Sequence, residues 1–193
     1  MVWIIIGVLV LAAIGPIFYL MPSKRERQLA NVRMIARRLG LGVDLTHIPD
    51  VAAPPEARVS AGGVERHPTI ECASYKRLHV TRLEHAPTWQ LLRDESSRAP
   101  LSGWRFADRN ARIAQPAAYW TRIAPIIDAL PGGCLSVHCT AQFTAWAGTE
   151  TFKGEDPETV ITAISDGLGE IIALHTEMDA AIRAEKGEET DEP

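Results

Sequence analysis

The first 22 residues constrain this chain more than any other segment does. Residues 2–21, VWIIIGVLVLAAIGPIFYLM, contain no charged side chain. A bilayer core about 30 Å thick needs roughly 20 apolar residues in a helix, and a helix satisfies its backbone hydrogen bonds internally. Trp3 and Tyr19 stand near the two ends of the run, where amphipathic rings favour the membrane interface. The sequence therefore predicts an uncleaved transmembrane anchor over residues 1–22.

Two other interpretations of this run are a cleaved signal peptide and a buried core helix. A signal peptide begins with a positive region and ends in small residues. Here no Lys or Arg precedes the run, and its last residues, 17–22, are bulky. A charge-free run of this length is also unusual for a helix in a globular domain. The pattern favours the anchor over both alternatives.

A basic segment follows the apolar run and sets the expected orientation. Positive flanks stay in the cytoplasm, so we expect a single-pass protein of a bacterial inner membrane, with its N-terminus outside and its C-terminal domain in the cytoplasm. We also expect the basic residues to attract anionic lipid headgroups. The membrane-proximal basic residues are Lys24, Arg25, Arg27, Arg33, Arg37 and Arg38.

Residues 23–48 are predicted to form a basic juxtamembrane helix and a short strand. Ser23 and Glu26 match a capping box, and apolar residues recur at helical spacing as far as Leu39. The apolar stripe of this helix fits the membrane interface and the surface of the folded domain equally well. A strand is predicted over residues 43–48.

Beyond this helix, we predict a linker at residues 49–68, a cytoplasmic α+β domain at 69–185 and an acidic tail at 186–193. The linker is rich in Pro, Ala and Gly. Charge is uneven along the chain, because residues 1–60 carry seven Lys or Arg against four Asp or Glu, whereas residues 151–193 carry three against twelve. This polarity fits a domain held at a membrane better than a nucleic-acid-binding protein, which carries a broad basic face.

The predicted order of elements in the domain is β-β-β-α-β-α. Strands are predicted over residues 69–84, 89–93 and 103–106, and a helix that Pro125 kinks or divides is predicted over residues 116–130.

The last two predicted elements complete the fold class. Residues 134–146 alternate strictly between two faces, which predicts one long strand. A capped helix follows from Asp156 to about residue 185, in which Gly167 and Gly169 either allow close packing or mark a bend. The fold class is then α+β, a mainly antiparallel sheet covered by helices on one face and preceded by a single N-terminal transmembrane helix.

The cysteines favour free thiols, because Cys72, Cys134 and Cys139 are an odd number. Cys134, His138 and Cys139 form the one compact cluster of soft metal ligands. A zinc site needs four converging ligands, and on a strand Cys139 points away from the other two. We therefore expect no metal, no other cofactor and no catalytic residue.

An enzymatic alternative uses the same cluster. A thiol becomes a nucleophile when a histidine stands beside it, and His175 or His85 would have to approach a cysteine through the fold. No Gly-x-Ser-x-Gly, His-Glu-x-x-His, Walker or dinucleotide-binding pattern is present.

Trp89, Trp104 and Arg105 are a candidate partner surface, because Trp and Arg are enriched at interface anchors. The tryptophans also lie in predicted elements beside other apolar residues, which fits a place in the core.

The anchor, the basic SKRER segment and the small domain together resemble a group of uncharacterised single-span proteobacterial inner-membrane proteins, some of them called YajC-like. The resemblance covers mainly residues 1–45, with similar features at Trp89, at residues 103–105 and at residues 146–148. It implies an accessory role beside a membrane complex and carries over no catalytic residue.

We therefore expect a membrane-tethered, non-enzymatic accessory, assembly or scaffold protein whose cytoplasmic domain binds a protein partner of an inner-membrane complex. A tether raises the local concentration of the domain near such a partner. The alternatives are a metal- or thiol-dependent enzyme that uses Cys134, His138 and Cys139, and a peripheral domain that senses anionic lipid.

Overall fold

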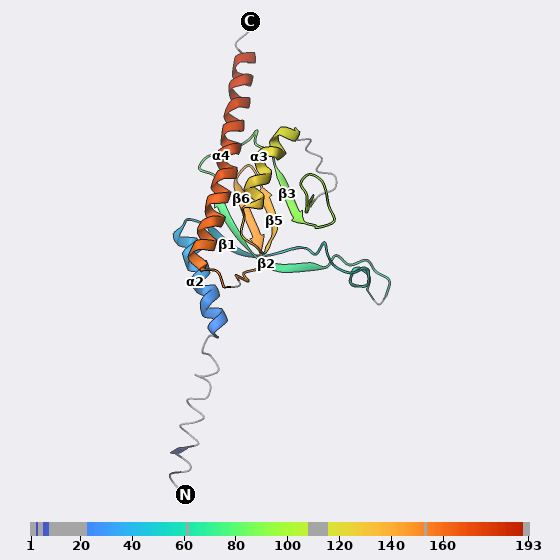
Figure 1. Ribbon diagram of the computed structural model, residues 1–193, viewed down its shortest axis with the longest axis vertical. Coiled ribbons are helices and arrows are strands. Elements are labelled where there is room, and N and C mark those ends of the chain that lie inside the picture. Colours follow the sequence, from blue (N-terminus) through green and yellow to red (C-terminus); the bar gives the residue numbers. More distant parts are fainter. Residues whose placement is uncertain are drawn as a thin grey trace.

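The computed structural model describes Trp3 and residues 6–7, 23–60, 62–107, 116–152 and 154–190. The helices are α2 (Lys24–Arg38), α3 (Ala117–Asp128) and α4 (Pro157–Thr190), and a short 3₁₀ helix is η1 (Pro55–Arg58). The strands are β1 (Gly42–Pro49), β2 (Thr69–Leu78), β3 (Trp89–Arg93), β4 (Trp104–Phe106), β5 (Cys134–Cys139) and β6 (Phe143–Gly148). Figure 1 shows the long helix α4 running past the sheet, so that its last turns project beyond it.

The six strands form one antiparallel sheet in the order β1-β2-β6-β5-β3-β4. Strand β1 pairs with β2 along its whole length. The other four strands are neighbours in the order β6, β5, β3 and β4 and form a second set. The ladder between β2 and β6 joins the two sets. The structure is therefore an α+β fold in which the middle of the sheet depends on a pairing between distant parts of the chain.

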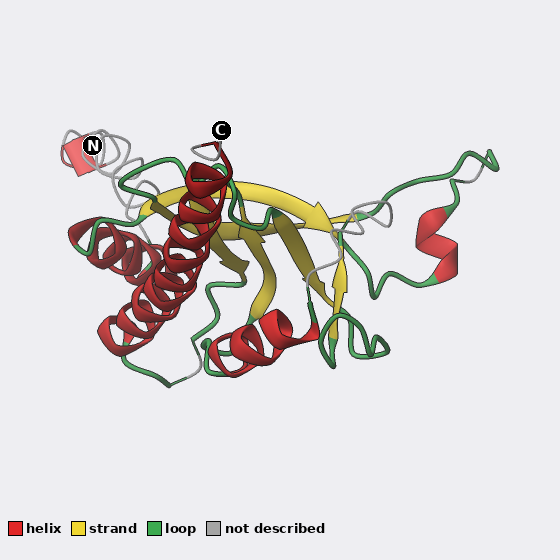
Figure 2. Ribbon diagram, turned by 90° about the horizontal axis from the view of Figure 1, so that it is seen from above, coloured by secondary structure: helices red, strands yellow, loops and turns green. Residues whose placement is uncertain are grey.

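The helices α2, α3 and α4 lie on one face of the sheet (Figure 2). The register explains this arrangement, because Tyr75, Trp146, Val137 and Leu91 are successive cross-strand partners and so point to the same face. All four side chains are fully buried. This helix-covered face therefore holds most of the hydrophobic core.

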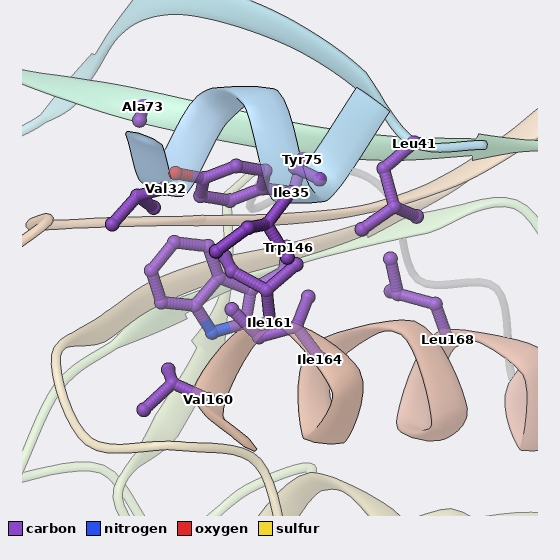
Figure 3. Packing of buried hydrophobic residues seen from close by; sticks show 11 residues of the cluster. Val32, Ile35, Leu41, Ala73, Tyr75, Trp146, Val160, Ile161, Ile164 and Leu168 are labelled. Carbon is purple, nitrogen blue, oxygen red and sulfur yellow. The ribbon is translucent and has the colours of Figure 1, made fainter. Parts of the chain in front are cut away.

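The larger part of the core joins α2 and α4 to the middle of the sheet. Val32 and Ile35 of α2 and Ile164 of α4 meet the rings of Tyr75 and Trp146, which are 5.6 Å apart (Figure 3). A fully buried aliphatic side chain stabilises a fold by roughly 1.5–3 kcal/mol. Helix α2 is therefore an integral part of the packed core and not an appendage of it.

The second part of the core lies beneath α3, which packs Tyr119, Ile123 and Ile127 against β3, β4 and β5. Helix α3 continues through Pro125 without division.

The opposite face of the sheet carries no helix. Its apolar residues form a small cluster of Ile48, Cys72, Leu92 and Ala147, all buried. Beside this face the connection between β1 and β2 extends away from the sheet as a long arm that contains η1 (Figure 2). Arg58 holds the base of this arm by donating hydrogen bonds to the carbonyl oxygens of Ala53 and Val51.

The predicted fold class is wrong in its first element. The predicted anchor at residues 1–22 lies outside the described residues except for Trp3 and residues 6–7. Among the residues that the structure describes, no helix has both the length and the apolar character needed to cross a bilayer. Even α4, with 34 residues, carries charged side chains along its length.

The predicted strand at residues 134–146 is two strands, β5 and β6, joined by a tight turn. The Thr140 hydroxyl accepts hydrogen bonds from the backbone N–H groups of Gln142 and Phe143, and Thr140 N–H donates to the Phe143 carbonyl. Threonine forms such local side-chain turns without glycine or proline. The two-residue alternation between the faces of a strand continues through this turn in the sequence, so the pattern does not reveal the chain reversal.

Two local predictions are confirmed. Ser23 and Glu26 form the reciprocal hydrogen bonds of a capping box at the start of α2. The glycines of α4 allow close packing, because an added Cβ at Gly167 would lie 2.7 Å from Leu130 and one at Gly169 would lie 3.0 Å from Arg77.

Candidate functional site

The cluster of Cys134, His138 and Cys139 is divided between the two faces of β5. Cys139 faces the helices, whereas the ring of His138 lies on the helix-free face, 5.3 Å from the ring of Phe143. Cys134 packs beside the core at the start of the strand. The described ranges of the chain contain no group of three or more His, Cys, Asp or Glu residues that could hold a metal ion. These three residues therefore form no common site.

Cys139 instead belongs to a hydrogen-bonded chain at the other end of β5. It is the cross-strand partner of Thr144, and hydrogen bonding by the Thr144 side chain lowers the pKa of the Cys139 thiol. The Thr144 hydroxyl also lies 3.1 Å from His79 Nε2, and His79 Nδ1 lies 3.2 Å from the Ala141 carbonyl oxygen. We call Cys139, Thr144 and His79 the thiol–imidazole chain.

The direction of this chain follows from its last member. A carbonyl oxygen only accepts, so His79 Nδ1 carries the hydrogen and the Nε2 atom of the neutral ring is an acceptor. The single hydrogen of the Thr144 hydroxyl then points to His79 Nε2 while the imidazole is neutral, and it can turn to the Cys139 sulfur when the thiol is ionised. The Thr144 hydroxyl therefore stands between the Cys139 thiol and an imidazole nitrogen that can accept a proton.

Backbone pairing holds the members of the chain together. Leu78 is the last residue of β2 in register with β6, opposite Phe143. Directly after it, His79 N–H donates to the Gln142 carbonyl oxygen at 2.9 Å. The segment after β2 is thus fixed against the β5–β6 turn, and this contact brings the imidazole to the thiol.

A second buried chain lies above Cys139 on the helix side. Trp89 Nε1–H donates to the Tyr119 oxygen at 2.5 Å, and that oxygen lies 2.7 Å from His175 Nε2. With Tyr119 O–H donating to Nε2, each polar hydrogen of these three side chains has an acceptor, except the hydrogen on His175 Nδ1. The Nδ1 atom is buried and has no hydrogen-bond partner within the described part of the chain. We call these three residues the indole–phenol–imidazole chain.

Burial keeps the groups of both chains neutral. It raises the pKa of the Cys139 thiol far above its usual range, although the Thr144 hydrogen bond acts in the opposite direction. Burial, together with the neighbouring His79, lowers the pKa of His175 to about 4. It also lowers the pKa of His79, against the effect of the Ala141 carbonyl. At neutral pH the site therefore contains a protonated thiol and neutral imidazoles.

Access to this site differs between its members. Cys139 and His175 are fully buried, whereas His79 is half-buried at the edge of the sheet. A thiol attacks only as the thiolate, and this arrangement gives the thiol a base within two hydrogen bonds. His79 is therefore the most exposed member of the thiol–imidazole chain.

His175 was one of the two histidines that the sequence suggested as a neighbour for a cysteine, and the structure places it against Trp89 and Tyr119 of the core cluster that contains Cys139. The other, His85, contacts Asp179 through its backbone N–H instead. His79 and Thr144 were missed. His79 lay inside the strand predicted over residues 69–84, and the structure ends this strand at Leu78, so no signal in the sequence marked it.

The candidate partner surface is largely internal. Trp89 and Trp104 are buried beneath α3. Arg105 is half-buried on the helix-free face, 4.0 Å from Asp94. The membrane-proximal basic residues lie on α2 and are exposed, except for Arg33, which pairs with the buried carboxylate of Glu150.

The three cysteines are free, as predicted. Cys72 faces the helix-free side of the sheet, and burial together with Glu71 raises the pKa of its thiol. Neither Cys72 nor Cys134 has a histidine as a hydrogen-bond partner among the described residues.

Comparison with known proteins gives one informative similarity. The chain is 31% identical over 80 residues to a protein N-terminal glutamine amidohydrolase of Arabidopsis thaliana. The match covers 42% of this chain and 36% of that relative, so this chain spans about a third of the relative's length. No family model matches the sequence. No solved structure matches it either.

This similarity contradicts the prediction of a non-enzymatic scaffold, because the relative is an enzyme. It favours the enzymatic alternative that the cysteines suggested. The predicted single-pass inner-membrane localisation is corrected as well, by this relative together with the lack of a membrane-spanning helix among the described elements.

Proposed function

We propose that this protein is a thiol-dependent hydrolase of carboxamides, with Cys139 as nucleophile. The observation that carries the proposal is the arrangement of the thiol–imidazole chain, in which Thr144 is the cross-strand partner of Cys139 and its hydroxyl lies 3.1 Å from His79 Nε2. The similarity to an N-terminal glutamine amidohydrolase suggests the bond that is cleaved. A substrate of this type is a peptide that begins with glutamine.

In the first half of the reaction, the Cys139 sulfur attacks the carbonyl carbon of the amide. Its proton moves to the Thr144 oxygen while the Thr144 proton moves to His79 Nε2. The resulting imidazolium returns a proton to the amide nitrogen, the C–N bond breaks, and ammonia leaves. The product of this half is a thioester on Cys139.

In the second half, water attacks the thioester carbon and gives a proton to His79. The C–S bond then breaks, and the proton returns through Thr144 to the sulfur, so the carboxylic acid leaves and the thiol is restored. Cys139 is enclosed in the structure. The reaction therefore requires the segment after β2 or the β5–β6 turn to move aside when substrate binds.

The test is ammonia release from a short peptide with N-terminal glutamine, measured with the purified full chain. Three matched variants separate the thiols: we expect Cys139→Ser to abolish the activity, and Cys72→Ser and Cys134→Ser to retain it. Loss of a general base typically costs roughly 10²–10⁴-fold in rate, which is the range expected for His79→Gln.

Thr144 is a positioning residue, and its variants distinguish relay from packing. Thr144→Ser keeps the hydroxyl and should keep most of the activity, whereas Thr144→Val keeps the shape and should lose it. Circular dichroism establishes that each variant is folded. Activity that survives in folded Cys139→Ser, or a folded wild-type chain that releases no ammonia, overturns the proposal.

A further inference from the structure

A cleft of about 410 Å³ lies on the helix-free face of the sheet, across the ends of β1, β2, β3 and β5. Its volume is within the usual range for small-molecule sites, about 300–1,000 Å³. Two chain segments form its walls, residues 50–52 after β1 and residues 93–96 at and beyond the end of β3. The cleft is independent of the proposed active site, because Cys139 lies on the opposite face and four residues further along β5.

The floor of the cleft is apolar. It is formed by the side chains of Ile48, Ile70, Leu92 and Leu135, and Val51 contributes from one wall. Ile48 and Leu92 are at most 4% exposed, so the floor is packed and rigid. A short aliphatic chain laid on this floor would remove apolar surface from water on both partners.

The rim of the cleft is acidic. Asp50, Asp94 and Glu95 line it, and Arg93 is its one cationic residue. The guanidinium of Arg93 is engaged elsewhere, 5.1 Å from the centre of the Trp104 ring. Arg105 approaches only Asp94, at 4.0 Å. Among the residues that the structure describes, the carboxylates of Asp50 and Glu95 therefore form no ion pair.

The rim carboxylates are held in place by local hydrogen bonds. Asp94 accepts from the backbone and the hydroxyl of Ser96, and these bonds lower its pKa, so that it is ionised at neutral pH. Asp50 accepts from the backbone N–H of Ala52. Two fixed carboxylates thus stand on opposite walls of an apolar cleft.

We infer that this cleft binds an amphipathic cation, an aliphatic chain of about four to six carbons that ends in a primary ammonium group. The chain lies on the floor, and the ammonium lies between the carboxylates of the two walls. A free alkylamine, a lysine side chain and the amino terminus of a peptide with an apolar first residue all combine an ammonium group with apolar carbon.

The test is titration of the full chain with alkylammonium ions, followed by NMR. For hexylammonium we expect shifts at residues 48–52, 92–96 and 135, and an affinity that rises about threefold to fourfold for each methylene from butylammonium to hexylammonium. Hexanoate and hexanol should bind at least tenfold more weakly. Parallel titrations with Nα-acetyl-lysine amide and with leucine amide show which natural source fits better.

Variants test the rim separately from the floor. Glu95→Gln should weaken hexylammonium binding several-fold and Glu95→Lys should abolish it, while Glu185→Gln, an exposed change on α4, should have no effect. The inference fails if hexanoate binds as tightly as hexylammonium, if Glu95→Lys leaves binding unchanged, or if the shifts fall outside the cleft. None of these readouts depends on hydrolase activity.

Discussion

His175 occupies a position in which a charged imidazole is strongly disfavoured. Its folded pKa is about 4, against about 6.5 in an unfolded chain. As the pH falls from 6.5 to 4, the unfolded state takes up a proton and the native state does not, so the native state loses stability. The loss from this residue is roughly 3 kcal/mol when the pH reaches 4.

The measurement is urea unfolding at several pH values for the wild type and for His175→Gln. Because glutamine does not titrate, we expect the variant to show a flatter dependence of unfolding free energy on pH between 4 and 6.5. Parallel curves for the two proteins over this window would contradict the assignment. Above pH 7 the histidine contributes no pH dependence in either case.

Gly148 is required for steric reasons at the end of β6. An added Cβ would overlap the Gly133 carbonyl oxygen and lie 2.7 Å from the Trp146 ring. Overfilling a packed site typically costs about 1–3 kcal/mol, so we expect Gly148→Ala to reduce the free energy of unfolding by that amount. Gly132→Ala, which meets nothing within 4 Å, is the control and should change it by less than about 0.5 kcal/mol.

At the residue scale, the sequence predicted part of the site. Alternation in a strand correctly separated His138 from Cys139, and His175 was one of two histidines named as possible neighbours of a thiol. The contact between Thr144, beside Cys139, and His79 was not predictable. It depends on the register between β2 and β6, and local periodicity carries no information about which distant strands pair.

Helix α2 is tied to the sheet by a buried polar cluster. Arg33 donates two hydrogen bonds to Glu150, of 3.0 and 2.5 Å, and Tyr75 O–H donates to the same carboxylate at 2.7 Å. The Glu150 side chain is only 8% exposed. These contacts join the first described helix to the segment that precedes α4.

We expect Glu150→Ala to cost about 2 kcal/mol, because it leaves the Tyr75 hydroxyl and part of Arg33 without partners away from water. The control is Glu177→Ala, which breaks the pair between α3 and α4 formed with Arg122. Both members of that pair are more than half exposed, so the loss should be under about 1 kcal/mol. Equal losses in chemical denaturation of the two variants would show that the buried cluster has no special role.

Element types were easier to predict than element boundaries. The start of α2 followed from Ser23 and Glu26, since capping is a local hydrogen-bond pattern. The turn between β5 and β6 was missed because it uses Thr140 rather than glycine or proline, and because alternation continues on both sides. A period of two identifies strands but does not show where the chain reverses.

The arm between β1 and β2 is the part of the molecule least connected to the rest. Its contacts are mainly internal, such as the bridge between Val59 and Glu65 and the hydrogen bonds of Arg58. The ladder below it ends where Asp50 N–H donates to the Pro68 carbonyl oxygen. Replacing residues 54–66 with a short glycine–serine turn should therefore leave the sheet intact.

We expect this shortened chain to unfold with a free energy within about 1 kcal/mol of the wild type, because the entropy of loop closure changes slowly with loop length. Chemical denaturation measures it, and the hexylammonium titration reports whether the walls of the cleft remain in place. A loss of several kcal/mol would show that the arm supports the core.

The ladder between β2 and β6 has a consequence for how the chain reaches its structure. The β1–β2 hairpin and the set from β3 to β6 can each begin to form from nearby residues, but β2 must wait for β6, which is made only after α3 and β5. Chains dominated by such distant pairings fold in milliseconds to seconds rather than microseconds. During synthesis, β2 therefore leaves the ribosome long before its partner and spends that interval with one edge unpaired.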